Sequence, residues 1–285
     1  MKSSVAIIAL ALAANVAMGQ TSGSGSPAPQ AQTGAATASS TAPHQPQAKS
    51  KEEFDAYNAA ASKMDPAQLE VAADEFVQKF PNSELKELLY IRAMNMYQQQ
   101  NNSGKVIATG RKAIELNPAD PVPLVAVASA LVMDTRENDL DRDARYAEAG
   151  KDAQSALDNV DTGLQVPPGV PPDRIAAAKA NLRSIAYDSL GVIAMNKKDY
   201  AAAEQSFQKA ADLMKDQPDA VVYLRLSVAQ DNQSKYPEAL DSANKAVQYA
   251  PDGSAEKNLA KQQQARLQKL IAEKAPAATP VPQPH

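Results

Sequence analysis

The acidic run Asp139-Leu140-Asp141-Arg142-Asp143 is the part of this sequence that comes nearest to a chemical site. Alternating carboxylates are the oxygen ligands that a hard cation such as Ca²⁺ prefers. An EF-hand loop, however, needs a glycine where Ala144 stands and a bidentate glutamate where Gly150 stands. We therefore interpret the run as the solvated start of a helix, where acidic side chains favour the helix dipole, and predict no metal ligand.

Residues for catalysis are also scarce. The chain has no cysteine and two histidines, His44 and His285, which both lie in terminal segments that look disordered. It contains no glycine-rich phosphate loop, no serine with a usable histidine and no paired carboxylates in a recognisable setting. Tyr187, Tyr223 and Tyr236 are explained by packing roles. We therefore predict a protein that is not an enzyme, with no catalytic residue and no cofactor.

The charge of the chain bears on its partners. The net charge is −4 and the pI is near 5.4. Lys and Arg are interleaved with Asp and Glu, so the sequence has no basic stripe of the kind that neutralises phosphates. We expect no nucleic acid partner.

The N-terminus has the three parts of a secretory signal peptide. Lys2 precedes an apolar core at residues 5–14, and small residues at 17–19 flank a cleavage position before Gln20. The core falls short of the ~20 residues that span a bilayer, and no second hydrophobic segment follows. We predict that residues 1–19 are a signal peptide, that the protein is periplasmic or secreted, and that it has no membrane span.

Low-complexity segments flank the rest of the chain. Residues 20–50 consist mainly of Ser, Thr, Ala, Gly, Pro and Gln, which offer too little apolar surface to offset the entropy of ordering. Residues 275–285 are rich in proline. We predict a disordered leader over 20–50 and a disordered tail over 275–285. The signal peptide and the lack of cysteine favour a bacterial envelope protein.

Residues 51–274 are rich in helix-forming residues and show helical periodicity. Three pairs with proline mark helix boundaries: Asp65-Pro66, Asn117-Pro118 and Ala250-Pro251. A polar run over 134–142 and a Pro-rich insertion over about 159–173 interrupt the pattern. The sequence predicts an all-α domain with an extended surface loop at the insertion.

Two adjacent segments of this domain repeat the same residue pattern. The repeated positions, 36 residues apart, hold Tyr187, Leu190, Gly191, Tyr200, Ala203, Phe207 and Ala210, then Tyr223, Leu226, Ser227, Tyr236, Ala239, Ala243 and Ala246. The pattern resembles the tetratricopeptide repeat, a helical hairpin of ~34 residues. The resemblance implies an α-solenoid of about five antiparallel hairpins with a C-terminal capping helix over 254–274. Gly110 stands where the second hairpin should have an aromatic residue, so we expect close but weakly anchored helix packing there.

The resemblance also implies a concave binding groove, lined by the first helices of successive hairpins. Carried over onto this sequence, its residues are mostly apolar. They are Leu88, Ile91, Asn95, Val122, Val125, Ile185, Asp188, Val192, Met195, Val221, Leu224 and Val228, together with Gln98, Ser129, Val132 and Asp231. One class of these repeats clamps a terminal carboxylate with cations, but Ile91, Val122 and Ile185 replace them here. We predict no such clamp.

The predicted function is therefore an exported scaffold whose groove binds a helix or peptide segment of a protein partner. Two alternatives are an assembly factor of an envelope, pilus or secretion complex, and a carrier or hydrolase with a site in the Pro-rich insertion. The groove residues also have an alternative role, which is packing against the chain's own long helix, the Pro-rich loop or a second copy. The sequence leaves the partner's identity and self-association open.

Overall fold

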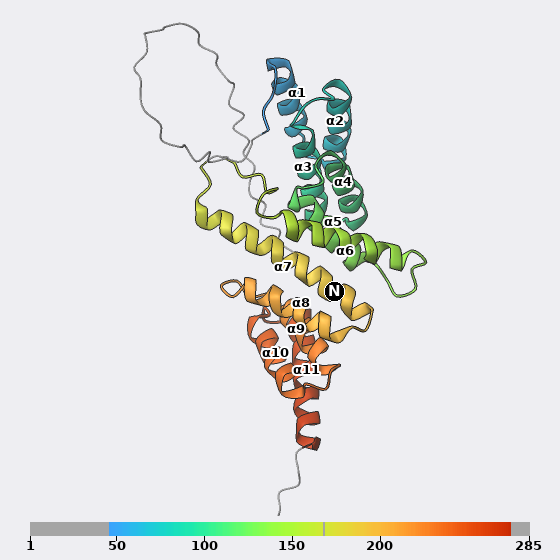
Figure 1. Ribbon diagram of the computed structural model, residues 1–285, viewed down its shortest axis with the longest axis vertical. Helices are drawn as coiled ribbons and strands as arrows, with labels where there is room; N and C mark the ends of the chain where they lie inside the picture. Colours follow the sequence, from blue (N-terminus) through green and yellow to red (C-terminus); the bar gives the residue numbers. More distant parts are fainter. Residues whose placement is uncertain (1–45, 168, 275–285) are drawn as a thin grey trace, which may run out of the picture.

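The computed structural model describes residues 46–167 and 169–274, which form an elongated stack of helices (Figure 1). These residues contain eleven α-helices and no strand. The helices are α1 (Lys51–Ala61), α2 (Pro66–Lys79), α3 (Lys86–Gln99), α4 (Ser103–Leu116), α5 (Pro121–Asp134), α6 (Arg142–Asn159), α7 (Pro172–Asn196), α8 (Tyr200–Leu213), α9 (Ala220–Asp231), α10 (Tyr236–Tyr249) and α11 (Ala255–Lys274). The predicted all-α fold is confirmed.

Several predicted segments lie outside the described residues. They are the signal peptide over 1–19, most of the leader over 20–50 and the tail over 275–285, with His44 and His285. In the part of the chain that the structure describes, no helix is both long enough and apolar enough to cross a membrane.

Aspartate side chains cap the start of several helices. Asp65 Oδ1 accepts a hydrogen bond from the backbone N of Gln68 at 2.9 Å, and Pro66 follows as the first helical residue. Asp199 Oδ1 accepts one from the backbone N of Ala202 at 3.0 Å. Such a cap satisfies a donor that has no partner inside the helix. The helix start predicted at Asp65-Pro66 is confirmed.

Consecutive helices pack on each other along the stack, from α1 with α2 to α10 with α11. They pair into five hairpins, α1/α2, α3/α4, α5/α6, α7/α8 and α9/α10. Helix α11 then packs on both α9 and α10, where its Leu267 is fully buried beside Ala239 and Ala243. The predicted solenoid of five hairpins with a capping helix is confirmed.

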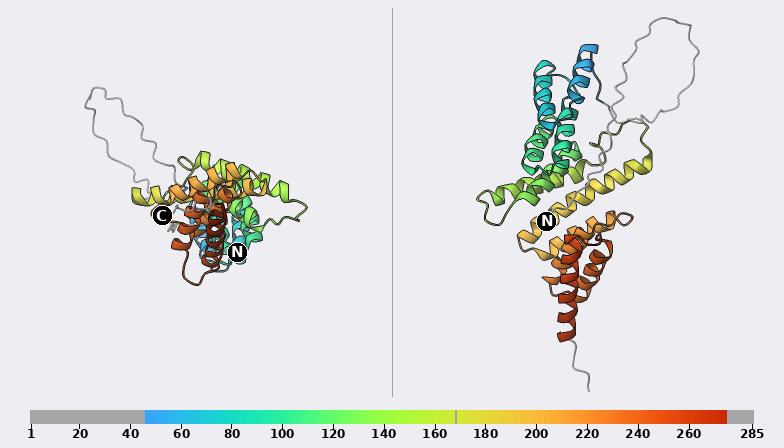
Figure 2. Two further views of the ribbon diagram at one scale, coloured as in Figure 1. Left: turned by 90° about the horizontal axis from the view of Figure 1, so that it is seen from below. Right: turned by 180° about the vertical axis from the view of Figure 1, so that it is seen from behind.

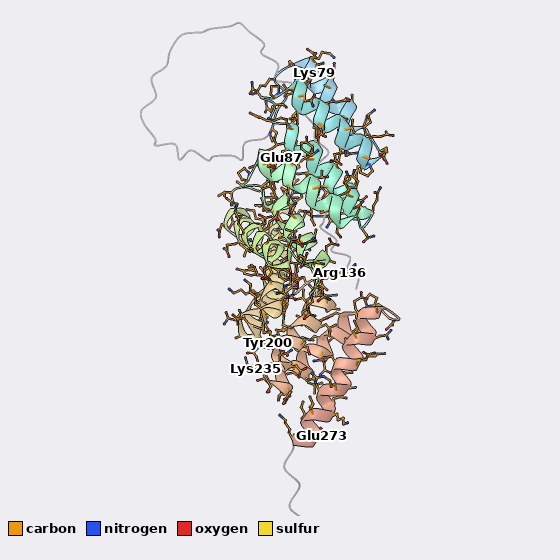
Figure 3. The ribbon with its side chains drawn as sticks, turned by 90° about the vertical axis from the view of Figure 1, so that its right-hand side faces the viewer. Lys79, Glu87, Arg136, Tyr200, Lys235 and Glu273 are labelled. Atoms are coloured by element: carbon orange, nitrogen blue, oxygen red, sulfur yellow. The ribbon has the colours of Figure 1, made fainter. Side chains whose placement is uncertain are left out.

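The first helices of the hairpins lie together on one side of the stack. Contacts join α1 with α3, α3 with α5, α5 with α7, α7 with α9 and α9 with α11, whereas consecutive second helices of the described hairpins are not in comparable contact. The first helices therefore form the inner face of the solenoid. In Figure 2, α7 crosses the middle of the molecule, and Lys79 and Glu273 mark positions near its opposite ends in Figure 3.

Small residues let the two helices of a hairpin approach closely. A Cβ atom on Gly191 of α7 would lie 2.5 Å from the Phe207 ring of α8. Phe207 is fully buried, as are Ala203 and Ala210 on the same helix. The helices are close enough at this point that only glycine fits opposite the ring. The packing roles predicted for these residues are confirmed.

The acidic run lies in the connection between α5 and α6. Helix α6 begins at Arg142, and Asp143 is exposed in its first turn. Arg145 anchors the connection, because its NH2 donates to Asp134 Oδ2 at 2.9 Å and its Nε to Thr135 Oγ1 at 2.9 Å. Within the described ranges, no group of three or more His, Cys, Asp or Glu side chains could hold a metal ion.

The Pro-rich segment between α6 and α7 is only partly a surface loop. Its described residues, 160–167 and 169–171, contain no helix. Val160 and Leu164, however, are only 1% and 7% exposed and belong to the apolar cluster of α5, α6 and α7. Their burial is favoured because it removes apolar surface from water. The predicted surface loop is corrected accordingly, since its first half belongs to the core.

Candidate binding surface on the inner face

The predicted groove residues all lie on the first helices α3, α5, α7 and α9, and none is fully exposed. Five are buried with at most 9% exposure: Leu88, Ile91, Val125, Val221 and Leu224. The others are half-buried: Asn95, Val122, Ile185, Asp188, Val192, Met195 and Val228. Of the four further positions, Val132 is buried, and Gln98, Ser129 and Asp231 are half-buried. The inner face thus offers a partner fewer side chains than the sequence pattern implies.

The α5 part of the inner face is covered by the chain itself. Helix α7 packs directly on α5, and Val125 on α5 is fully buried. Val122 of α5 packs on the same apolar cluster as Ile185 and Val192 of α7. For α5, the groove residues therefore pack against the chain's own long helix, which was the alternative role.

The part of the inner face between α7 and α9 differs, because charged and half-buried apolar side chains lie side by side there. Met195 of α7 packs at the edge of the α8 and α9 cluster, and Val228 of α9 lies half-buried outside the apolar clusters of the described residues. Arg225 NH1 of α9 donates to Asp188 Oδ2 of α7. Asp188 Oδ1 is buried and has no hydrogen-bond partner among the described residues. Met195, Val228 and the Arg225 side chain keep part of their surface exposed here.

A second charged pair continues the face from α9 to α11. Arg266 of α11 pairs with Asp231 of α9, and Asp231 Oδ2 also accepts a hydrogen bond from Gln263 Nε2 at 3.0 Å. The repeat pattern identified the two aspartates of the face but missed Arg225 and Arg266. Arg225 follows Asp188 by about one repeat length, so the pair was detectable. Arg266 lies on the capping helix, which does not share the repeat pattern, so no comparable signal pointed to it.

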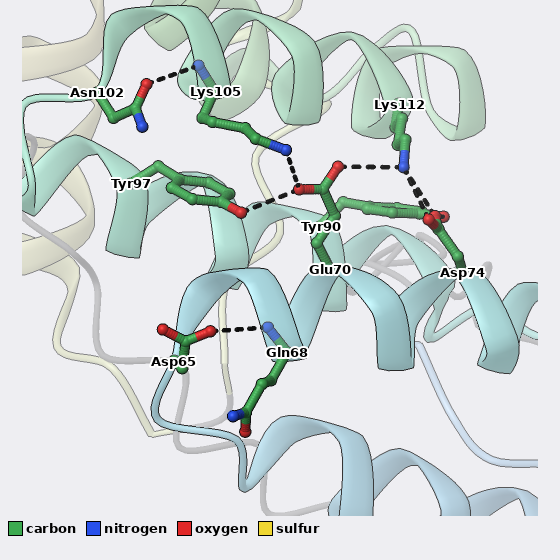
Figure 4. Close-up of polar contacts among 9 residues, drawn as sticks. All are labelled: Asp65, Gln68, Glu70, Asp74, Tyr90, Tyr97, Asn102, Lys105 and Lys112. Carbon is green, nitrogen blue, oxygen red and sulfur yellow. Dashed lines mark hydrogen bonds and ion pairs between the residues drawn. The ribbon is translucent and has the colours of Figure 1, made fainter.

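A polar cluster joins the first hairpin to the second, on α2, α3 and α4 (Figure 4). Lys112 Nζ donates to Glu70 Oε1 at 3.3 Å and to Asp74 Oδ1 at 2.8 Å. Tyr97 Oη donates to Glu70 at 3.0 Å, and Tyr90 Oη donates to Asp74 at 2.6 Å. Burial raises the pKa of Asp74, but the hydrogen bonds from Lys112 and Tyr90 outweigh it and hold that pKa below its ordinary value. The cluster fastens the hairpins together.

A lysine of the second helix lies over a tyrosine ring of the first helix at the same repeat position in three hairpins. The distances from Nζ to the ring centroid are 5.2 Å for Lys112 and Tyr90, 5.1 Å for Lys209 and Tyr187, and 5.3 Å for Lys245 and Tyr223. Cation–π attraction therefore links the two helices of each hairpin. The sequence pattern predicted the tyrosines as packing residues and missed the lysines.

Comparison with known protein families matches residues 185–216 to the tetratricopeptide repeat. The matched residues cover the second part of α7 and all of α8, with the contact between Gly191 and Phe207. Comparison with curated proteins finds no relative by sequence.

Solved structures of similar arrangement include that of Pseudomonas aeruginosa pilF, at 16% identity and a TM-score of 0.49, covering 80% of this chain and 96% of that chain. The APC/C hetero-tetramer Cut9-Hcn1 is similar at 15% identity and a TM-score of 0.36, over 77% of this chain and 42% of that chain. Acl4, described as the assembly chaperone of RpL4, is similar at 11% identity and a TM-score of 0.41, over 79% of this chain and 99% of that chain. None of these three likenesses bears on function.

Proposed function

Because the chain is a protein of the tetratricopeptide-repeat family, we propose that it is a non-enzymatic scaffold that binds a protein partner on the inner face of its solenoid. The observation that carries the proposal is the part between α7 and α9. There Val192, Met195 and Val228 are half-buried near the ion pair of Asp188 and Arg225. A partner that covers this apolar surface gains ~25 cal/mol for each Å² removed from water.

The side chains of this face define the chemistry of the partner. An amphipathic helix or an extended peptide with one apolar stripe fits Met195 and Val228. The Arg225 side chain is 26% exposed, and its other N–H groups suit a carboxylate or carbonyl oxygen. The preferred segment therefore carries polar groups beside its apolar stripe.

We further propose that residues 1–19 direct export and that the scaffold acts in the periplasm or outside the cell. The support is the order of Lys2, the apolar core over 5–14 and the small residues over 17–19. N-terminal sequencing of the protein purified from its native host tests this. A mature chain that begins at Gln20 is expected, and a mature chain that retains residues 1–19 contradicts export by cleavage.

The binding proposal is tested by cross-linked capture from envelope extract. Val228→Lys places a charge on the reachable part of the face, and its half-buried position lets the lysine stem extend to water. Gln208→Lys, on the exposed side of α8, is the matched control. Buried Val125 and Leu224 are unsuitable, because a charge there would disrupt folding.

The full-length chain and Gln208→Lys are expected to capture the same partner, and Val228→Lys is expected to lose it while keeping its helical circular dichroism. Equal capture by all three chains, or capture by none, contradicts binding on this face. A partner recovered as a subunit of a stable envelope complex would identify the scaffold as an assembly factor.

An enzyme or carrier site in the Pro-rich insertion has less support. Leu164 is buried, and Gln165 Nε2 donates to Glu87 at 2.9 Å, so the first half of the insertion packs against the stack. If a catalytic site lay there, deletion of residues 166–172 would abolish turnover although the protein still folded.

A further inference from the structure

A non-helical segment of the chain packs beside the predicted groove residues of α5 and α7. Residues 160–167, which follow α6, contain no helix or strand, and we call them the strap. Leu164 of the strap is 7% exposed and lies in the apolar cluster of α5, α6 and α7. Val166 packs against the same cluster as the groove residues Val122 and Ile185. The strap therefore occupies part of the inner face.

The strap also reaches α3 on the second hairpin. Gln165 Nε2 donates to Glu87 Oε2 at 2.9 Å, and Glu87 (Figure 3) directly precedes the predicted groove residue Leu88. Gly163 approaches the turn between α4 and α5 so closely that a Cβ atom would lie 2.0 Å from the carbonyl oxygen of Ala119. The strap thus lies at the end of the inner face where α3 and α5 begin, and only glycine fits at its closest approach.

The contacts of the strap are those of a bound peptide. Leu164 and Val166 are two residues apart and pack against an apolar cluster, and Gln165 between them gives an amide to a carboxyl group. Recognition of a peptide segment by a groove commonly uses this pattern, in which alternate side chains enter apolar surface and polar groups fix the position. The chain therefore shows on itself which kind of segment fits this part of the inner face.

The anchorage of the strap depends on few side chains. Leu164 is the single buried side chain among residues 161–167. Asp161 is paired with two cations of α7, but its side chain is 65% exposed, and exposed ion pairs contribute little to stability. Leu164 and Gln165 are therefore the principal anchors.

The chain between the strap and α7 leaves room for movement. Residues 169–171 contain no helix, and α7 begins at Pro172. Gly169 is exposed with a φ of 78°, and a Cβ atom there would meet nothing within 4 Å. Because Gly169 is not packed against the stack, a change in its backbone lets the strap leave its site while α6 and α7 stay in place.

We propose that the inner face between α3, α5 and α7 is a further peptide-binding site, that the strap is its internal ligand, and that a partner segment with the same order of apolar, amide and apolar side chains displaces the strap. The displacement exchanges like contacts: an apolar side chain replaces Leu164 in the cluster, and an amide replaces Gln165 as the donor to Glu87. The strap belongs to the same chain and has a high effective concentration, so it keeps the site closed to segments that match poorly.

This proposal does not rest on the partner of the part between α7 and α9, because its tests use the chain's own segment. A peptide with the sequence of residues 159–167, NVDTGLQVP, is labelled with fluorescein, and fluorescence polarisation measures its binding to the full-length chain. In the double variant Leu164→Ala, Gln165→Ala the strap lacks its two principal anchors, whereas the helices that form the site are unchanged. Thr162→Ala, at an exposed position of the strap, is the matched control.

We expect the peptide to bind the double variant about tenfold more tightly than the parent chain, or more, because the competing segment is weakened. Thr162→Ala should bind the peptide as the parent does. A control peptide with alanine at both anchor positions should not bind the double variant. Equal affinity for the parent and the double variant, or no binding to a double variant that keeps its helical circular dichroism, overturns the proposal, as does equal binding of the control peptide.

The opening of the strap gives a second test, which leaves Gln165 in place. The chain has no cysteine, so Leu164→Cys carries a single thiol in the strap, and Leu182→Cys, on α7 in the same cluster, is the matched buried control. If the strap opens locally, position 164 should react with a thiol reagent about tenfold faster than position 182, or more. An excess of unlabelled peptide should raise the rate at position 164 alone, because it fills the vacated site. Equal rates at the two positions, as expected when both open only by unfolding of the stack, overturn the proposal.

Discussion

In the hairpins α3/α4 and α7/α8, a large residue on one helix packs against a glycine on the other at the same repeat positions. The helix that carries the large residue differs between the two hairpins. In the repeat alignment, Met94 of α3 stands at the position of Gly191 of α7, and Gly110 of α4 stands at the position of Phe207 of α8. A Cβ atom on Gly110 would lie 3.1 Å from Met94 Sδ, and one on Gly191 would lie 2.5 Å from the Phe207 ring. The contact thus depends on complementary volume across the two helices, and either helix can supply the large side chain.

The comparison bears on the sequence interpretation of the second hairpin. The absence of an aromatic residue at Gly110 predicted close but weakly anchored helix packing, and the close packing is confirmed. Met94 and Val127, both fully buried, occupy the space instead, and a Cβ on Gly110 would lie 2.4 Å from Val127 Cγ2. The second hairpin is therefore as closely packed as the fourth.

Removal of the large residue should have the largest effect on stability in either hairpin. Phe207→Ala is expected to destabilise α7 to α10 by ~3–5 kcal/mol, and Met94→Ala to destabilise α1 to α5 by ~2–5 kcal/mol, because each leaves a cavity opposite a glycine. Thermal unfolding measures the loss, and hydrogen exchange shows which half is affected. Gln208→Ala, on the exposed side of α8, is the control. Unchanged unfolding of Phe207→Ala would refute the packing account.

Addition of a methyl group to the small residue should have the next largest effect. Gly191→Ala and Gly110→Ala are each expected to destabilise the protein by ~1–3 kcal/mol through overpacking, despite the better helix propensity of alanine. Gly150→Ala on α6 is the matched control, because its Cβ meets Ile193 at an ordinary 3.7 Å. That substitution should stabilise by up to about 1 kcal/mol. A stability change of the same sign for all three Gly→Ala substitutions would contradict the account.

Removal of a lysine that lies over a tyrosine ring should have a smaller effect on stability, and the effect should differ between the hairpins α7/α8 and α3/α4. Lys209→Met removes a cation–π contact with Tyr187 and should cost about 0.5–1 kcal/mol. Lys112→Met should cost more, because Lys112 also binds Glu70 and Asp74. Urea unfolding of the two variants measures the difference. Equal losses would mean that the acidic partners of Lys112 add nothing.

The smallest expected effect is on how the free energy of unfolding falls with pH under acidic conditions. The pKa of Asp74 is held below its ordinary value, so its stabilising contribution is present above the ordinary value and is lost as the pH falls through the folded-state value. Lys112→Met removes one cause of the lowering and should make the loss of stability on acidification less steep. Lys209→Met should leave the slope unchanged. An identical slope in both variants and the parent would contradict the assignment to Lys112.

The sequence predicted the architecture well because the repeat pattern concerns residues that touch within one hairpin. The roles of Gly191, Phe207 and the small residues of α8 follow from the resemblance to the tetratricopeptide-repeat pattern. The burial of residues 160–167 was not predictable, because Leu164 and Gln165 contact residues that are distant in sequence. The sequence also could not decide whether α7 covers the groove residues of α5. Periodicity predicts the helix face on which a residue lies, but not what packs against that face.

The central claim is that a partner binds where α7 and α9 leave the inner face accessible, and a photo-crosslinking amino acid tests it most directly. It is placed at Val228 on the inner face, and in a second chain at Gln208 on the exposed side of α8. The full-length proteins are irradiated in living cells. The account predicts a crosslinked partner from position 228 and none from position 208. A partner crosslinked from position 208 alone would contradict it.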